Sequence, residues 1–276
     1  MNGASTAAAS NGFEVELSTA APRQGGVVAI VVTSASPLPE VVVKDGDRRV
    51  ALERSGSGTV FRGLLGVDLD SPAGERTLVV EGDGLVVRER VNVLDGRFEV
   101  EKLRVPRDYV EPPKRVLARI KEDQRKVAAA WASALPDRLW AGKLRQPVDA
   151  PVRDNFGRKR VLNGTPKSPH NGIDFPAATG TAVVASAAAR VALAEALYFS
   201  GNSILLDHGN GLFTTYFHLS KLDVKAGDRV KPGQRIGAVG ATGRVTGLHL
   251  HMGARLHGAR VSPLALFALP EWPAAP

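Results

Sequence analysis

The sequence contains no cysteine among its 276 residues. Disulfide bonds and thiolate metal sites are therefore excluded, so a bound metal would need His, Asp or Glu ligands. Aromatic residues make up only 5% of the chain. No nucleic-acid-binding motif is present, so we predict no specific nucleic-acid partner, although the isoelectric point of about 10.0 would permit weak, non-specific binding.

Long apolar runs are also absent. The longest, around Val27–Val32, has the length of a strand, whereas a membrane-spanning helix needs about 20 apolar residues. Residues 1–12 lack the basic start and apolar stretch of a signal peptide and are predicted to form a flexible tail. Two interpretations follow: a cytoplasmic protein, or a sequence that begins after a removed export signal.

The net charge of +8 is unevenly distributed along the chain. Residues 1–112 contain 13 Lys and Arg against 17 Asp and Glu, whereas residues 113–276 contain 23 against 11. A basic C-terminal half attracts polyanions such as nucleic acid, a membrane surface or an anionic cell-wall polymer. Simple solubility is the alternative explanation.

Residues 13–95 have the pattern of short strands separated by turns. The β-prone runs are Val27–Thr33, Val41–Lys44, Val50–Leu52, Thr59–Arg62, Leu78–Glu81 and Leu85–Val93. Turn signals such as Asp45-Gly46 and Asp83-Gly84 lie between them. Short strands at this spacing predict an immunoglobulin-like β-sandwich. No cluster of His, Asp or Glu stands out here, so we interpret it as a packing or positioning module.

Residues 96–145 are predicted to be a linker that contains one amphipathic helix. Its apolar positions recur at helical spacing and are Val116, Ile120, Val127, Trp131 and Leu135. The other face is largely basic, which would suit a membrane surface. Packing of the apolar stripe on a neighbouring domain is the interpretation that we favour.

Residues 146–270 are predicted to form a second β domain. Gly227, Gly233, Gly237 and Gly240 recur between β-prone residues, as if short strands reversed at tight corners. This pattern is common in barrel-sandwich β folds, including lipoyl carriers. We find no equivalent of the modified lysine that those carriers display.

Three short motifs hold four of the six histidines and one aspartate. In the first, His170 and Asp174 would lie about 13 Å apart in a fully extended chain, and the Asn171-Gly172 dipeptide predicts a turn that brings them together. In the second, His249 and His251 share one face of a predicted strand, while Leu248, Leu250 and Met252 face a core.

The third motif, Thr214–Leu219, is a β-prone run that presents His218. A single strand histidine is more often structural than a ligand, and a His-x-His pair often arises by chance. The occurrence of all three motifs within one predicted β domain is what indicates a metal site.

The segment from Ala150 to Leu266 resembles the catalytic domain of the lysostaphin/LytM-type zinc endopeptidases, which cleave peptidoglycan peptides. The matching positions are Arg153, Phe156-Gly157, Arg160, His170-Asn-Gly-Ile-Asp174, Gly180-Thr-Ala-Val-Val-Ala185, Gly201-Asn202, Asp207-His208-Gly209, Tyr216-Phe-His218-Leu219, Gly240-Ala-Thr-Gly243 and Gly247-Leu-His249-Leu-His251. The resemblance implies an antiparallel, barrel-sandwich-like peptidase domain. It also implies export to the periplasm or cell wall.

The resemblance further implies that His170, Asp174 and His251 bind Zn²⁺ and that His218 and His249 are catalytic. Three protein ligands leave a fourth position for water, as in catalytic zinc sites. The chain has no His-Glu-x-x-His helix that would supply a glutamate base. We therefore expect His249 to act on the water and His218 on the oxyanion, or the reverse.

The other family positions have less specific interpretations. His208 is expected in a turn with no ligand role, and His257 at an exposed hairpin. Asn202 is interpreted as structural, and Arg153 and Arg160 either contact a substrate carboxylate or are ordinary surface or fold-supporting charges. Family members usually have proline where this chain has Leu248, and often other residue types at Met252 and Gly253. These departures affect strand packing and substrate preference rather than the ligands.

The sequence thus predicts a zinc-dependent endopeptidase acting on the peptides of bacterial peptidoglycan. The chief alternative is a non-catalytic adaptor that binds peptidoglycan or activates another cell-wall hydrolase. Degenerate relatives of that kind typically lose metal ligands, whereas this chain retains all five site residues.

Overall fold

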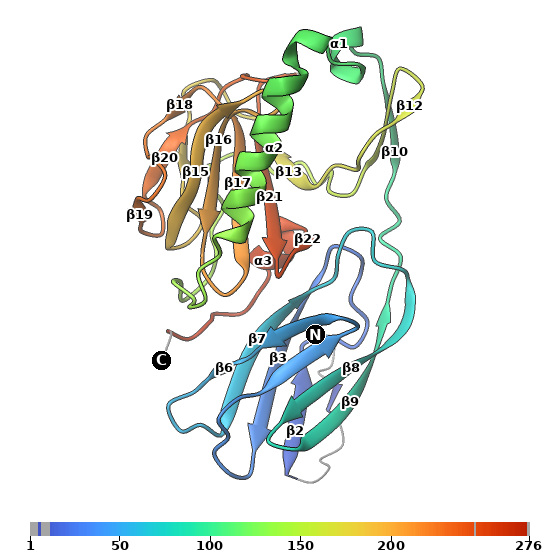
Figure 1. Cartoon of the computed structure of the whole chain (residues 1–276), viewed down its shortest axis with the longest axis vertical. Coiled ribbons are helices and arrows are strands. Elements are labelled where there is room, and N and C mark those ends of the chain that lie inside the picture. Colours follow the sequence, from blue (N-terminus) through green and yellow to red (C-terminus); the bar gives the residue numbers. More distant parts are fainter. Residues whose placement is uncertain (1–4, 7–11, 246, 275–276) are drawn as a thin grey trace. The chain divides into compact units, whose positions relative to one another are not determined.

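The computed structural model describes residues 5–6, 12–245 and 247–274 (Figure 1). The chain is mainly β, as predicted, and divides into two compact units that are described separately. The first unit comprises Met1–Gly96 and Leu256–Val261, and the second comprises Arg97–Arg255 and Ser262–Ala275. Most of the tail predicted over residues 1–12 lies outside the described residues.

The first unit consists of two antiparallel sheets with the strand orders β1-β2-β3-β7-β6 and β5-β4-β8-β9. Its strands are β1 (Ser5–Thr6), β2 (Phe13–Leu17), β3 (Val27–Ser34), β4 (Val42–Asp45), β5 (Arg48–Ala51), β6 (Glu53–Arg54), β7 (Val60–Gly66), β8 (Gly74–Gly82) and β9 (Leu85–Val93). The unit also contains β22 (Ala259–Val261), which belongs to neither of these two sheets. Each of the six β-prone runs found in the sequence overlaps one of these strands.

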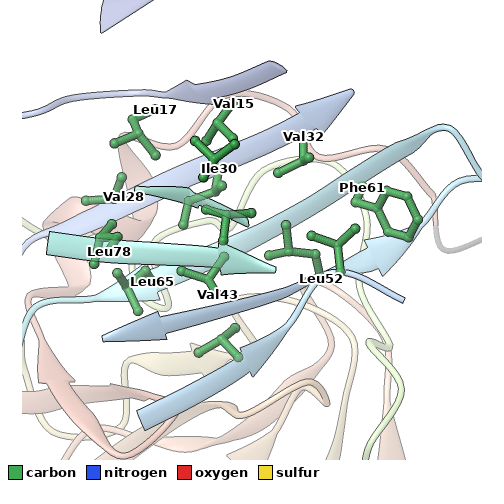
Figure 2. Packing of buried hydrophobic residues seen from close by; sticks show 14 of the residues in the cluster. Val15, Leu17, Val28, Ile30, Val32, Val43, Leu52, Phe61, Leu65 and Leu78 are labelled. Carbon is green, nitrogen blue, oxygen red and sulfur yellow. The ribbon is translucent and has the colours of Figure 1, made fainter. Parts of the chain in front are cut away.

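Both sheets contribute to a single hydrophobic core, whose packing is shown in Figure 2. On β3, Val28, Ile30 and Val32 are buried, whereas Thr33 is exposed. Because successive side chains of a strand point to opposite faces, this alternation turns one face of β3 towards the other sheet. Val43 and Leu78 come from that sheet and belong to the same cluster.

The second unit contains three sheets, with the orders β13-β21-β17-β16-β15-β19, β14-β20-β18 and β10-β11-β12. Its strands are β10 (Val100–Leu103), β11 (Lys159–Leu162), β12 (Thr165–Pro166), β13 (Gly172–Phe175), β14 (Ala182–Val184), β15 (Ala189–Leu197), β16 (Gly201–Asp207), β17 (Leu212–Leu219), β18 (Lys221–Leu222), β19 (Arg229–Val230), β20 (Arg235–Ala238) and β21 (Leu250–Leu256). Its helices are α1 (Arg107–Val110), α2 (Leu117–Ala132) and α3 (Pro263–Phe267), with a 3₁₀ turn at Lys114–Val116.

Helix α2 packs its apolar stripe on the largest sheet of the second unit (Figure 1). Ala130, Val127 and Trp131 meet Leu193 and Leu205 of β15 and β16. Apolar contact with a sheet removes this face from water, which favours packing over the membrane-surface alternative. Among the described residues, no helix combines the length and apolar character that crossing a membrane requires.

A network of buried polar side chains lies in the same sheet, around the connection between β16 and β17. The imidazole of His208 is fully buried, with Nδ1 2.9 Å from the carbonyl oxygen of Ala188 and Nε2 2.8 Å from Oγ1 of Thr214. The hydroxyl of Tyr216 lies 3.0 Å from both Thr214 Oγ1 and Ser186 Oγ. Burial lowers the pKa of His208 to about 4, so the neutral ring is the folded form at neutral pH.

We expect His208 to make the protein less stable in acid. Its folded-state pKa of about 4 lies below the ordinary 6.5, so between these values the unfolded chain binds a proton that the folded chain does not. The free energy of unfolding should therefore fall as the pH drops from about 6.5 to about 4, by up to about 3 kcal/mol. Urea titrations of wild type and His208→Gln, both in chelator, measure this. Identical pH slopes for the two proteins would contradict the expectation.

Candidate metal centre

Two strands bring an aspartate and a histidine face to face. Strands β13 and β21 pair in antiparallel register with Asp174 directly opposite His251. His170 lies just before β13, and its Nε2 is 2.8 Å from Nδ1 of His251 and 3.3 Å from Oδ1 of Asp174. The third separation, from His251 Nδ1 to Asp174 Oδ1, is 3.1 Å. Three donor atoms thus converge on one point.

The donor set suits a zinc ion. Bonds of about 2.0–2.1 Å in tetrahedral geometry place ligand atoms about 3.3 Å apart, close to the separations between these three atoms. His170 donates Nδ1–H to the carbonyl oxygen of Asn155, at 2.9 Å, which leaves its Nε2 with a free lone pair. Such a hydrogen bond to the second ring nitrogen is usual for metal-bound histidine. His170, Asp174 and His251 are therefore a candidate zinc site.

The turn predicted at Asn171-Gly172 is absent, because Gly172 already begins β13. The glycine has a different function. A Cβ at Gly172 would clash with the backbone oxygen of Met252 and would lie only 2.7 Å from Nε2 of His251, both on the paired strand. A bare backbone at this position therefore makes room for the imidazole that faces Asp174.

Asn155 is a site residue that the sequence analysis missed. Its side-chain amide donates a hydrogen bond of 2.7 Å to Oδ2 of Asp174, and its backbone carbonyl accepts the one from His170. A bridge between Arg153 and Asp174 places Asn155 beside the carboxylate. Asn155 thus orients two candidate ligands while contributing no ligand atom of its own. Its place next to the Phe156-Gly157 pair was the only sequence signal.

His218 reaches the site through an irregular strand. The pairing of β16 with β17 shifts register between Asn202 and Ile204, opposite residues 216–219, and His218 has a φ of +64°. Left-handed backbone is rare for a residue other than glycine, and a bulge re-aims the side chain. Nδ1 of His218 lies 2.9 Å from the carbonyl oxygen of Thr242. Burial lowers the pKa of His218 to about 4.

His249 lies at the edge of the site, where the prediction for the strand needs correction. Strand β21 begins at Leu250, so His249 precedes it, and Leu248 is 52% exposed instead of facing a core. Nδ1 of His249 lies 3.0 Å from the carbonyl oxygen of Gly247. Its Nε2 is 3.5 Å from Oδ1 of Asp174. The ring centroids of His218 and His249 are 5.1 Å apart.

Electrostatics keep two of the candidate ligands, Asp174 and His251, in metal-binding protonation states. Burial raises the pKa of Asp174, but the two histidines beside it, His170 and His251, outweigh this effect and hold the pKa well below its ordinary value. Burial lowers the pKa of His251 to about 3. Metals bind carboxylate and neutral imidazole, so neither a proton on Asp174 nor a charge on His251 competes near neutral pH.

A pocket of about 680 Å³ opens over the centre and is lined by Asp174, His218, His249 and His251. Asp174 and His251 are therefore accessible from this pocket, whereas His170 is buried behind them. The other two histidines lie elsewhere: His208 is in the buried network described above, and His257 is half-buried. The exposure predicted for His257 is thus wrong, and burial lowers its pKa to about 4.

Asn202, interpreted from the sequence as structural, braces the neighbouring loop. Its side-chain amide donates to the carbonyl oxygen of Leu219, at 3.0 Å, and its backbone N–H donates to Oγ1 of Thr242, at 2.9 Å. The hydroxyl of Thr242 donates in turn to Leu219. The loop that carries the carbonyl partner of His218 is therefore fixed from β16 and β17.

Three nitrogen and oxygen donors, an open pocket and two further histidines are the features of a hydrolytic metal centre. Comparisons with known proteins agree with this class. Residues 168–263 match peptidase family M23. Peptidoglycan DD-endopeptidase ShyA of Vibrio cholerae serotype O1 is 32% identical over 231 residues, which cover 80% of this chain and 51% of ShyA. ShyC of the same organism, also a peptidoglycan DD-endopeptidase, is 40% identical over 44% of this chain and 28% of its own.

A crystal structure assigned to peptidase M23 from Pseudomonas aeruginosa superposes with a TM-score of 0.68 and 31% identity. The match covers 89% of this chain and 95% of that one. The chain belongs to peptidase family M23, and the family resemblance seen in the sequence is confirmed. It spans about half the length of ShyA.

We expect Asn155→Ala to weaken zinc binding without removing a ligand. The variant loses the amide that holds Asp174 Oδ2, and losses of this kind cost about 10- to 100-fold in metal affinity. Competition titration against a chromophoric chelator measures the change. Asn171→Ala is the matched control, because Asn171 lines the same pocket but is exposed. An unchanged zinc affinity in Asn155→Ala would contradict the orienting role.

We also expect Gly172→Ala to impair the centre, because the added Cβ would crowd both the His251 ring and the backbone oxygen of Met252 on the paired strand. Zinc affinity should fall by about 10-fold or more, since a displaced ligand is at least as costly as a lost orienting bond. Gly247→Ala should have no such effect, because a Cβ there meets nothing within 4 Å. Equal affinities of the two variants in the same titration would show that Gly172 is not needed for space.

Proposed function

We propose that this chain is a zinc-dependent endopeptidase that hydrolyses peptide bonds in the cross-links or stem peptides of bacterial peptidoglycan. The observation that carries the proposal is the convergence of His170, Asp174 and His251 beneath a pocket that also contains His218 and His249. The names of the relatives ShyA and ShyC support peptidoglycan as the substrate. Such a substrate would place the protein outside the cytoplasm, in the periplasm or at the cell wall.

A bound zinc ion would supply Lewis acidity and lower the pKa of a water ligand to about 7. His170 would bind through Nε2, Asp174 through Oδ1 and His251 through Nδ1. Asn155 would keep the first two of these groups in place.

The two remaining histidines, His218 and His249, would interact with the protons of the attacking water. Nδ1 of each lies against a backbone carbonyl oxygen, that of Thr242 for His218 and that of Gly247 for His249. The proton on each neutral ring is therefore assigned to Nδ1, and Nε2 is an acceptor. Neither ring can donate a hydrogen bond from Nε2 until it has received a proton.

This protonation pattern favours one division of roles. We assign His249 as the base, because its Nε2 lies next to Asp174 and can accept the proton of the attacking water and pass it to the leaving amine. His218 would accept a hydrogen bond from the water and orient it. The oxyanion role expected from the sequence would need a protonated His218, which its lowered pKa of about 4 disfavours.

The first unit is proposed to be an immunoglobulin-like positioning module over residues 13–95. Its two antiparallel sheets with one shared core support this. Within the described residues, the candidate metal cluster belongs to the second unit. We accordingly propose residues 96–145 as a connecting segment and residues 146–270 as the peptidase domain.

Substitutions should separate metal binding from catalysis. His251→Ala and Asp174→Ala should lose bound zinc and activity together, because each removes a ligand. His249→Ala and His218→Ala should retain zinc but lose about 100-fold or more in turnover, the usual contribution of a group that handles a proton. Zinc content is measured by atomic emission, and activity by mass spectrometry of peptides released from purified sacculi. His257→Gln is the control outside the site.

The same assay tests the adaptor alternative. An adaptor would bind sacculi yet release no peptides after zinc is added, and this result would falsify the proposed activity. Full turnover in His218→Ala or His249→Ala would refute the role of that histidine while leaving the metal site in place.

A further inference from the structure

The pocket beside the metal centre contains an excess of positive charge. Its acidic lining residues are Glu101 and Asp174, and its basic ones are Arg153, Arg158, Arg160, Lys167 and Arg244. A concave site lined by one sign of charge concentrates ligands of the opposite sign. Coordination of Asp174 to a divalent cation would strengthen this bias. The pocket therefore favours an anionic ligand over a neutral one.

Most of the cations that line the pocket already have partners within the second unit. Arg158 forms ion pairs with Glu99 at 3.1 Å and Glu101 at 3.5 Å. Lys167 donates to the carbonyl oxygen of Val110 at 3.0 Å. The guanidinium of Arg244 lies over the ring of Phe199, 4.5 Å from its centroid.

Arg160 differs from these three residues because its ion pair with an acidic side chain is incomplete. It stands in β11, directly opposite Glu101 of β10 in a parallel register. Its Nε is 3.9 Å from Oε2 of Glu101, too far for a hydrogen bond, and is buried without a hydrogen-bond partner. A buried guanidinium N–H without an acceptor is unfavourable, so Glu101 neutralises Arg160 only in part. The side chain is 34% exposed and lines the pocket, so its accessible N–H groups can bind an acceptor that enters there.

The charge of Arg160 also acts on the metal centre. Burial lowers the pKa of Arg160, and the negative charges of Asp174 and Glu101 oppose this effect. The same guanidinium helps to lower the pKa of His218. Arg160 lines the same pocket as Asp174, His218 and His251, so it can contact a substrate held at the centre.

We propose that Arg160 is a specificity-determining residue that binds a free carboxylate of the substrate, next to the bond that is cut. The proposal rests on the proposed peptidase function and narrows its substrate class to peptides that are acidic at this position. A guanidinium matches a carboxylate with two parallel hydrogen bonds. A carboxamide in its place would leave the charge of Arg160 uncompensated. Glu101 holds Arg160 in position and competes with the incoming carboxylate.

The test compares two fluorescent stem-peptide analogues that differ at one group, a free carboxylate or a carboxamide. Fluorescence anisotropy gives their dissociation constants with the zinc-loaded chain, and hydrolysis is followed in parallel. The wild type should bind the carboxylate peptide about 10- to 100-fold more tightly, as expected for a charge-assisted hydrogen bond. Arg160→Gln should lose this preference with unchanged affinity for the carboxamide peptide. Arg160→Lys should retain part of it, and Glu101→Gln should increase it.

Arg229→Gln is the matched control, because Arg229 is an exposed arginine of β19 outside the pocket, and it should behave as wild type. Thermal melting checks that each variant is folded. Equal affinities of the wild type for the two peptides would overturn the proposal. A preference that persists in Arg160→Gln would also overturn it, because the carboxylate would then bind the metal or another cation. An equal loss of affinity for both peptides in Arg160→Gln would overturn it as well.

The binding measurement also separates this inference from the function on which it rests. A chain that prefers the carboxylate peptide through Arg160 but hydrolyses neither peptide would overturn the peptidase proposal and leave the subsite intact. A chain that hydrolyses both peptides equally well and binds them equally tightly would overturn the Arg160 subsite and leave the peptidase proposal intact.

Discussion

The pairing of β13 with β21 is the constraint on which the site depends. It sets Asp174 opposite His251 across residues distant in the chain. A slip of one residue would turn Asp174 to the other face of the sheet and dismantle the donor set. The register also explains Gly172, which lies beside the His251 ring and leaves space for it. Strand geometry and metal chemistry are therefore satisfied by the same few residues.

Burial makes this arrangement costly unless every polar group finds a partner. A buried carboxylate and two buried imidazoles are unfavourable in isolation. Here Asp174 accepts a hydrogen bond from Asn155 through one oxygen and faces the two candidate ligand histidines through the other. A divalent cation would complete the set by taking up lone pairs that face each other. The same network therefore pairs the buried carboxylate and presents the donor atoms to a metal.

His218 and His249, the two histidines proposed to be catalytic, are held in different ways. His218 is buried and sits in left-handed backbone at a strand irregularity, a conformation that persists only where the surroundings enforce it. The hydrogen bonds from Asn202 to Thr242 and from His218 to Thr242 hold it in this conformation. His249 precedes its strand and is more exposed. A rigid water-orienting group beside a more accessible base is consistent with the roles proposed for them.

The sequence by itself determined the mainly β character, the family and the identity of the residues that meet at the centre. Alternating apolar residues and the short motifs that contain His170, Asp174 and His251 are local patterns, which can be recognised in the sequence alone. Asn155 and the partial pairing of Arg160 were decided by tertiary structure alone. Both depend on which segments lie side by side: the bridge from Arg153 to Asp174 and the register of β10 with β11. The turn expected at Asn171-Gly172 was wrong for the same reason, because strand pairing with β21 overrides a local turn preference.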